Sequence, residues 1–117
     1  MVNRAAILLK YKAPAIRWIN EADPSEKDPG ITVDSVNLER TIFLISNADG
    51  DTGETVARWI KRNYKVLFEG ELEGWYTDPD LWPQKRTLKL FKEWFDVECH
   101  TVLIDTADGA IYDDDDI

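Results

Sequence analysis

The concentration of aromatic residues between positions 75 and 95 constrains the fold more than any other feature of this sequence. Six of the thirteen aromatic side chains lie in this stretch: Trp75, Tyr76, Trp82, Phe91, Trp94 and Phe95. Aromatic side chains bury large areas and dominate the energetics of cores and interfaces. We therefore expect these rings to fill the interior, and we expect the second half of the chain to organise the fold.

The length and composition predict one domain. The chain has 117 residues, of which 44% are hydrophobic, and this is enough for a real core. We expect a single globular domain over 1–112 and a flexible acidic tail over 113–117. The apolar run over 5–9 is too short for a signal peptide or a membrane span. Cys99 is the single cysteine, so no intrachain disulfide can form, and we expect a cytoplasmic protein.

Charge is distributed unevenly along the chain. Residues 1–92 carry fourteen acidic and fourteen basic side chains, whereas residues 93–117 carry nine acidic side chains and no Lys or Arg. The C-terminal part therefore accounts for the whole net charge of −9. Such a field disfavours nucleic acids and anionic membranes and favours a basic protein partner. The alternative is a solvated tail that serves solubility alone.

The first half of the sequence predicts two strands that flank a helix. The apolar run over 5–11 predicts a buried strand, and Pro14 suits the first turn of a helix over 14–22. The β-branched run over 40–46 predicts a second strand. Both strands are apolar on both faces, which indicates central positions in a covered sheet. A helical crossover would make them parallel.

The second half predicts mainly helix. From Val56 to Trp75 the apolar residues recur in steps of three, four and one, which is a helical stripe. We expect two helices, over 52–63 and 65–75, or one bent helix. The remaining expectations are a loop over 23–30, a helical turn over 32–38 capped by Thr32, a turn at Pro79 capped by Asp78, a helix over 84–95 and a strand over 97–105.

Together these elements predict an α/β fold, with α+β as the alternative. We expect a small sheet of three or four strands with helices packed on it, in the order β-α-β-α-α-α-β.

The acids after the second predicted strand resemble the start of a calcium loop. Asn47, Asp49 and Asp51 stand at alternate positions, but in an EF-hand loop that begins at Asn47 the sixth and twelfth positions would be Thr52 and Arg58. Neither residue fits that pattern. We interpret the segment as a helix start in which Asp51 or Thr52 is the N-cap and Glu54 completes a capping box.

The single histidine is the strongest candidate for chemistry. In a strand, His100 and Glu98 point to one face and Cys99 to the other, so the thiol and the imidazole do not form a pair. One His and one Cys also exclude the usual zinc sets. The alternative is a small enzyme or metal-dependent domain centred on His100 with Asp96, Glu98 or Asp105.

A second candidate region combines aromatic rings with acids. Rings beside a carboxylate such as Asp78 can bind a sugar or a cation, although they more often pack two helices together. The candidate binding residues are Trp75, Tyr76, Asp78, Trp82, Asp96 and His100. The sequence indicates no catalytic residue, no cofactor and no metal ligand.

The same region resembles a pattern in a family of small acidic bacterial proteins that has no assigned function. There, a W-Y-T-D segment leads to L-W-P, a helix, W-F-D and a strand with a histidine. The matching residues are Trp75, Tyr76, Thr77, Asp78, Leu81, Trp82, Pro83, Trp94, Phe95, Asp96 and His100. The resemblance covers roughly residues 54–105 and implies no activity. In size, acidity and layout the chain is also similar to barstar-like inhibitors and toxin-immunity proteins.

These observations predict a non-catalytic protein-binding module. An immunity or inhibitor protein that captures a basic partner is one form of this function, and the enzyme centred on His100 is the competing hypothesis.

Overall fold

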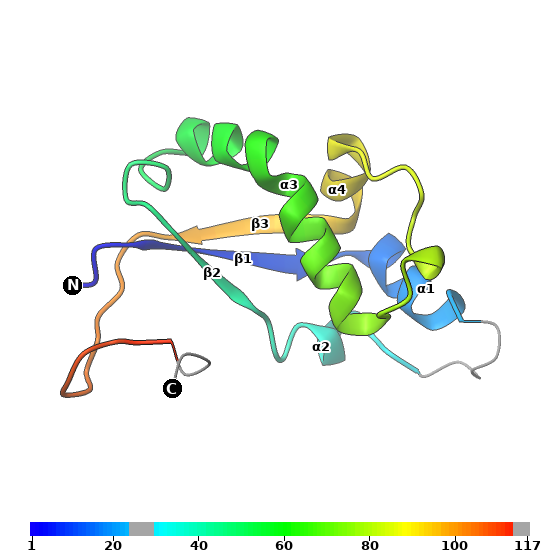
Figure 1. Cartoon of the computed structure of the whole chain (residues 1–117), viewed down its shortest axis with the longest axis horizontal. Coiled ribbons are helices and arrows are strands. Elements are labelled where there is room, and N and C mark those ends of the chain that lie inside the picture. Colours follow the sequence, from blue (N-terminus) through cyan, green and yellow to red (C-terminus); the bar gives the residue numbers. More distant parts are fainter. Residues whose placement is uncertain (24–29, 114–117) are drawn as a thin grey trace.

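The computed structural model describes residues 1–23 and 30–113. It has a three-stranded antiparallel sheet with helices packed on one side, which confirms the predicted small α/β fold (Figure 1). The elements in chain order are β1 (Ala5–Tyr11), α1 (Ala13–Glu21), α2 (Val33–Val36), β2 (Ile42–Ile45), α3 (Gly53–Trp75), the 3₁₀ helix η1 (Pro79–Leu81), α4 (Leu88–Trp94) and β3 (Phe95–His100). Most of the predicted loop over 23–30 and most of the predicted tail over 113–117 lie outside the described residues.

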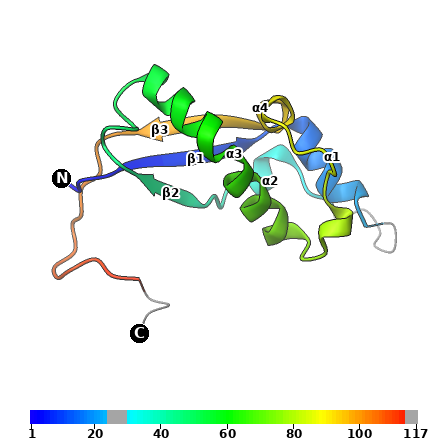
Figure 2. The same cartoon turned by 45° about the horizontal axis from the view of Figure 1, so that its top comes forward.

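The sheet order is β2-β1-β3, and β1 is antiparallel to both neighbours. The predicted parallel pairing of β1 with β2 is therefore wrong. A parallel pair requires the chain to return to the starting end of the first strand. Here α1 and α2 both lie near the C-terminal end of β1, so β2 begins there and runs back (Figures 1 and 2).

The predicted central position of β2 is also wrong, because β2 is an edge strand with one face uncovered. Ile42 and Leu44 are 57% and 53% exposed, whereas Ile45 is only 4% exposed. The apolar run in β2 therefore does not indicate burial on both faces. Its alternate residues serve two different surfaces, one against the helices and one against solvent.

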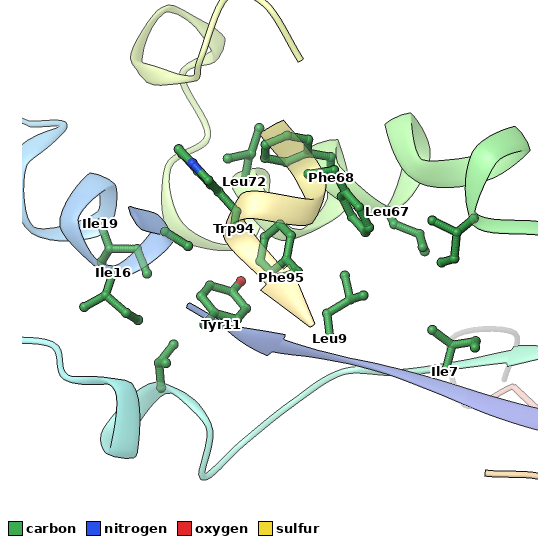
Figure 3. Close-up of a cluster of buried hydrophobic side chains, with 14 of the residues drawn as sticks. Ile7, Leu9, Tyr11, Ile16, Ile19, Leu67, Phe68, Leu72, Trp94 and Phe95 are labelled. Carbon is green, nitrogen blue, oxygen red and sulfur yellow. The ribbon is translucent and has the colours of Figure 1, made fainter. Parts of the chain in front are cut away.

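The helices α3 and α4 cover the other face and enclose the aromatic core (Figure 3). Phe68 from α3 lies 5.8 Å from Phe91 of α4 and 5.7 Å from Phe95 of β3, measured between ring centroids. Leu9 and Tyr11 of β1 complete the floor of this cluster. Buried rings of this kind contribute roughly 1.5–3 kcal/mol each through burial alone. The expectation that aromatic residues fill the interior is confirmed for Phe91, Trp94 and Phe95.

A single helix, α3, spans the region for which we predicted two helices, over 52–63 and 65–75, or one bent helix, so the two-helix prediction is wrong. The apolar stripe continues through the expected break, so continuous packing against the core favours one helix. The N-cap of α3 is Thr52, which was one of the two predicted alternatives. Its capping-box partner is Thr55 rather than the predicted Glu54.

Other element boundaries differ from the predicted ones. The predicted helix over 84–95 begins only at Leu88, because Thr87 caps it by accepting from Leu90 N. The predicted strand over 97–105 begins at Phe95 and ends at His100. The predicted caps Thr32 and Asp78 are confirmed.

Candidate functional site

The six predicted binding residues lie in two separate places. Four of them (Trp75, Tyr76, Asp78 and Trp82) lie at the C-terminal end of α3 and in the connection that follows. The other two, Asp96 and His100, lie on β3. The structure therefore does not assemble the six residues into one site.

The aromatic residues Tyr76 and Trp82 form hydrogen bonds with backbone carbonyl oxygens of the protein itself. Trp82 Nε1 donates to the carbonyl oxygen of Tyr76 at 2.7 Å, and the Tyr76 hydroxyl donates to the carbonyl oxygen of Ile19. Trp18 of α1 packs edge-on against the Tyr76 ring, with centroids 5.2 Å apart. These contacts join α1 to residues 75–82 at the end of α3. We call these residues the aromatic corner, and their rings pack the helices together.

Asp78 has a local role in the same corner. One of its carboxylate oxygens accepts a hydrogen bond from Asp80 N at 3.0 Å, which caps η1. The Arg86 guanidinium lies 5.7 Å from the Trp82 ring centroid and 3.3 Å from Glu69, so it closes the outer side of the corner.

The sequence did not predict a partly buried polar pair between β1 and α3. The Tyr11 hydroxyl donates to Glu71 Oε2 at 2.6 Å and accepts from Trp75 Nε1 at 3.0 Å. Burial raises the pKa of the Tyr11 hydroxyl and also that of the Glu71 carboxyl. The sequence carried a signal for this pair, because Glu71 follows the buried Leu67 by four residues and therefore falls on the core side of α3.

Asp96 and His100 belong to the uncovered face of the sheet, here called the open face. The strand register places eight side chains on it, of which Ala6 is 4% exposed: Ala6, Leu8, Lys10, Ile42, Leu44, Asp96, Glu98 and His100. The apolar side chains lie on β1 and β2, and the ionisable side chains of β3 form a row beside them. None of the described helices packs over this face (Figures 1 and 2).

Ion pairs order the charged row. Arg40 Nη1 lies 3.0 Å from Glu98 Oε1, and this guanidinium holds the pKa of the Glu98 carboxyl below its usual value. Lys12 Nζ lies 3.7 Å from Asp96 Oδ1. His100 Nε2 lies 3.6 Å from Glu98 Oε2, and the His100 side chain is 60% exposed. The imidazole is thus at the surface with one carboxylate near it.

Cys99 faces the opposite side of the sheet, as the alternation along the strand predicted. It lines a groove of about 480 Å³ between β3 and the start of α3, together with Val56, Ile60 and Val97. Burial raises the pKa of the Cys99 thiol, which makes it a weaker nucleophile near neutral pH. His100 does not line this groove, so the thiol and the imidazole remain apart.

The chain after β3 continues over 101–113 without helix or strand and bends at residues 107–109; this segment is here called the arm. Its large apolar side chains Val102, Ile104, Ile111 and Tyr112 are between 66% and 72% exposed. The arm leaves the sheet on the side opposite α3 (Figures 1 and 2). Val2 N donates to the carbonyl oxygen of Leu103 at 2.7 Å, which ties the start of the arm to the N-terminal segment. The predicted strand over 97–105 reaches into this segment, but its last residues, 101–105, form no strand.

Over 1–23 and 30–113, no group of three or more His, Cys, Asp or Glu side chains is arranged to hold a metal ion. Within the same ranges, no helix combines the length and the apolar character needed to cross a bilayer.

Comparison with known proteins gives no relative: no family model, curated protein or solved structure matches the chain.

Proposed function

We propose that this chain is a non-catalytic protein-binding module that uses the open face and the arm as its contact surface. The observation that supports this most is the exposure of six large apolar side chains, which lie on the open face and the arm: Ile42, Leu44, Val102, Ile104, Ile111 and Tyr112. Monomeric proteins rarely leave contiguous apolar surface to water, and such surface commonly marks an interaction site. The aromatic corner after α3 is already occupied by internal packing.

The arm sets the chemistry of the partner. Over 101–113 it carries Asp105, Asp108 and Asp113 and no Lys or Arg. A surface that combines apolar area with basic side chains therefore matches it best. Attraction of this kind accelerates association and weakens with added salt. An inhibitor or immunity protein that captures a basic partner is one form of this function.

The arrangement around His100 supports the binding hypothesis over the enzyme hypothesis. A general base works within a site that orients substrate and excludes water. His100 instead lies on an exposed strand face. Asp105 lies beyond the end of β3, where its Oδ1 accepts from Ala107 N at 2.9 Å.

The proposal is tested by titrating the isotope-labelled chain with two matched peptides of about ten residues, long enough to pair with a strand. One alternates Lys with Val and the other alternates Glu with Val. We expect the lysine peptide to bind more tightly, to shift the resonances of Val102, Ile104 and Tyr112, and to weaken as salt rises. The double variant Ile104→Ser with Tyr112→Ser is expected to lose this binding.

A matched control is Val66→Ser, which removes an exposed apolar side chain from α3, away from the proposed surface. It should bind the lysine peptide as the parent chain does. Equal affinity for the two peptides, or shifts confined to the groove beside Cys99, would overturn the proposal.

A further inference from the structure

The open face and the arm are complementary to each other, and this identifies a partner. Resting on the proposed function, we infer that the partner is a second copy of this chain, with the arm of each copy lying on the open face of the other. Such an exchange is reciprocal, so the two-fold symmetric pair is closed and leaves neither arm unpaired.

The apolar residues of the two surfaces have the same spacing. Ile42 and Leu44 project from one side of β2, two residues apart. Val102 and Ile104 are also two residues apart, and in extended chain they project to one side. An arm that lies along β2 can therefore place both of its side chains against both of those on the open face, with Leu8 of β1 beside them.

Charge complements the apolar match. Three basic side chains, Lys10, Lys12 and Arg40, lie on or beside the open face, with Asp96 and Glu98 as the acids. Lys12 and Arg40 pair with Asp96 and Glu98, so the local excess is one positive charge, that of Lys10, in a chain of net charge −9. The arm carries three acids in its described length and no basic residue. The open face thus offers the combination of apolar area and positive charge that the arm requires.

The course of the arm favours a second copy over the same chain. The hydrogen bond from Val2 N to the carbonyl oxygen of Leu103 holds the first arm residues beyond the end of the sheet. A return of Val102 and Ile104 onto the same open face would need a reversal directly after His100, which this bond opposes; the bend at residues 107–109 redirects only the residues beyond it. With that bend straightened, the residues over 104–113 would span about 33 Å, more than the roughly 23 Å of the seven-residue β1, so the arm can reach across the sheet of a neighbour.

The inference is tested by disulfide trapping between full-length chains, all carrying Cys99→Ser. One chain carries Leu44→Cys and the other Ile104→Cys, with a mass tag on one of them. We expect a mixed disulfide dimer to form at least about a hundredfold faster than with the control pair, because the exchange raises the effective thiol concentration from micromolar to millimolar. The control pair combines Ile104→Cys with Val66→Cys on α3.

Two further measurements separate the possible outcomes. A single chain with both Leu44→Cys and Ile104→Cys should give interchain products, and an intrachain disulfide would show that the arm returns to its own face and overturn the inference. Sedimentation of the parent chain should show a dimer that dissociates on dilution, and a single-chain mass at every concentration would equally overturn it.

The failure of this inference is distinguishable from failure of the proposed function. A chain that stays monomeric but binds the lysine peptide through its arm retains the proposed function and loses the second copy as its partner. A chain that dimerises through the trapped pair supports both.

Discussion

The two sides of β1 differ in what they contribute to the molecule. Ile7 and Leu9 on one side are 0% and 2% exposed under α3 and α4. Lys10 on the other side is exposed, beside the partly exposed Leu8. The same strand therefore supports a packed core and an uncovered surface. The comparison teaches that apolar residues in this chain serve two purposes, stability on the covered side and, in our proposal, recognition on the open side.

The largest expected effect comes from the covered side. Phe91→Ala removes a fully buried ring that contacts Phe68 and Phe95, and we expect a loss of about 3–5 kcal/mol in unfolding free energy. The measurement is urea denaturation followed by circular dichroism. Ile42→Ala on the open face is the matched control and should cost less than about 1 kcal/mol, because its side chain is already half exposed. Equal losses would remove the distinction between the two sides.

A second effect comes from a close approach on the covered side. A Cβ added at Gly50 would lie 2.4 Å from the Cβ of Ala5, a residue buried in β1. Gly50→Ala should therefore destabilise the fold by about 1–3 kcal/mol through overpacking. Gly70→Ala on α3 meets no neighbouring atom and should instead stabilise by about 0.5–1 kcal/mol. Thermal unfolding of both variants checks the opposite signs, and two changes of the same sign would contradict this account.

The sequence predicted the covered side better than the open side, for physical reasons. Helical periodicity marked the stripe of α3, and the caps Thr52 and Asp78 followed from local hydrogen-bonding chemistry. The direction of β2 did not follow, because strand pairing depends on where α1 and α2 place the chain. The exposure of Ile42 and Leu44 could not be predicted either, because an apolar strand has the same sequence pattern whether one or both of its faces are covered.

The candidate site shows the same division. Sequence reasoning placed His100 and Glu98 on one strand face, and the register agrees. It also grouped His100 and Asp96 with Trp75 and Trp82 as candidates, although the corner after α3 lies apart from β3. No local sequence pattern predicts which Trp side chains will donate their N–H groups to backbone carbonyl oxygens elsewhere in the fold. The pairing of Tyr11 with Glu71, sixty residues apart, needed the tertiary fold.

A third effect, smaller than the core losses, depends on pH and concerns the partly buried Glu71. Burial raises the pKa of this carboxyl in the folded state above its ordinary value of 4.5. Below that pH both states are protonated and the carboxyl costs nothing. As pH rises from there through the folded pKa, the folded state is penalised, so the parent chain loses stability. Glu71→Gln should remove this loss.

The measurement is urea denaturation of the parent chain and of Glu71→Gln between about pH 4 and pH 7. The stability of the variant relative to the parent should grow as pH rises. Glu69→Gln, whose carboxyl lies at the surface beside Arg86, is the control and should not reproduce the trend. A difference between parent and Glu71→Gln that stays constant with pH would show that the carboxyl is not destabilised by burial.

The smallest expected effect on stability is the most informative for function. Leu44→Lys puts a charge on the open face at a half-exposed position, so the unfolding free energy measured at high dilution should change by no more than about 0.5 kcal/mol. The same substitution should abolish the concentration-dependent mass of the chain, because it places a charge against the apolar residues of the incoming arm. Sedimentation and denaturation of one preparation measure both quantities. A large loss of stability would mean that the open face belongs to the core after all, and an unchanged mass dependence would mean that the copies do not meet there.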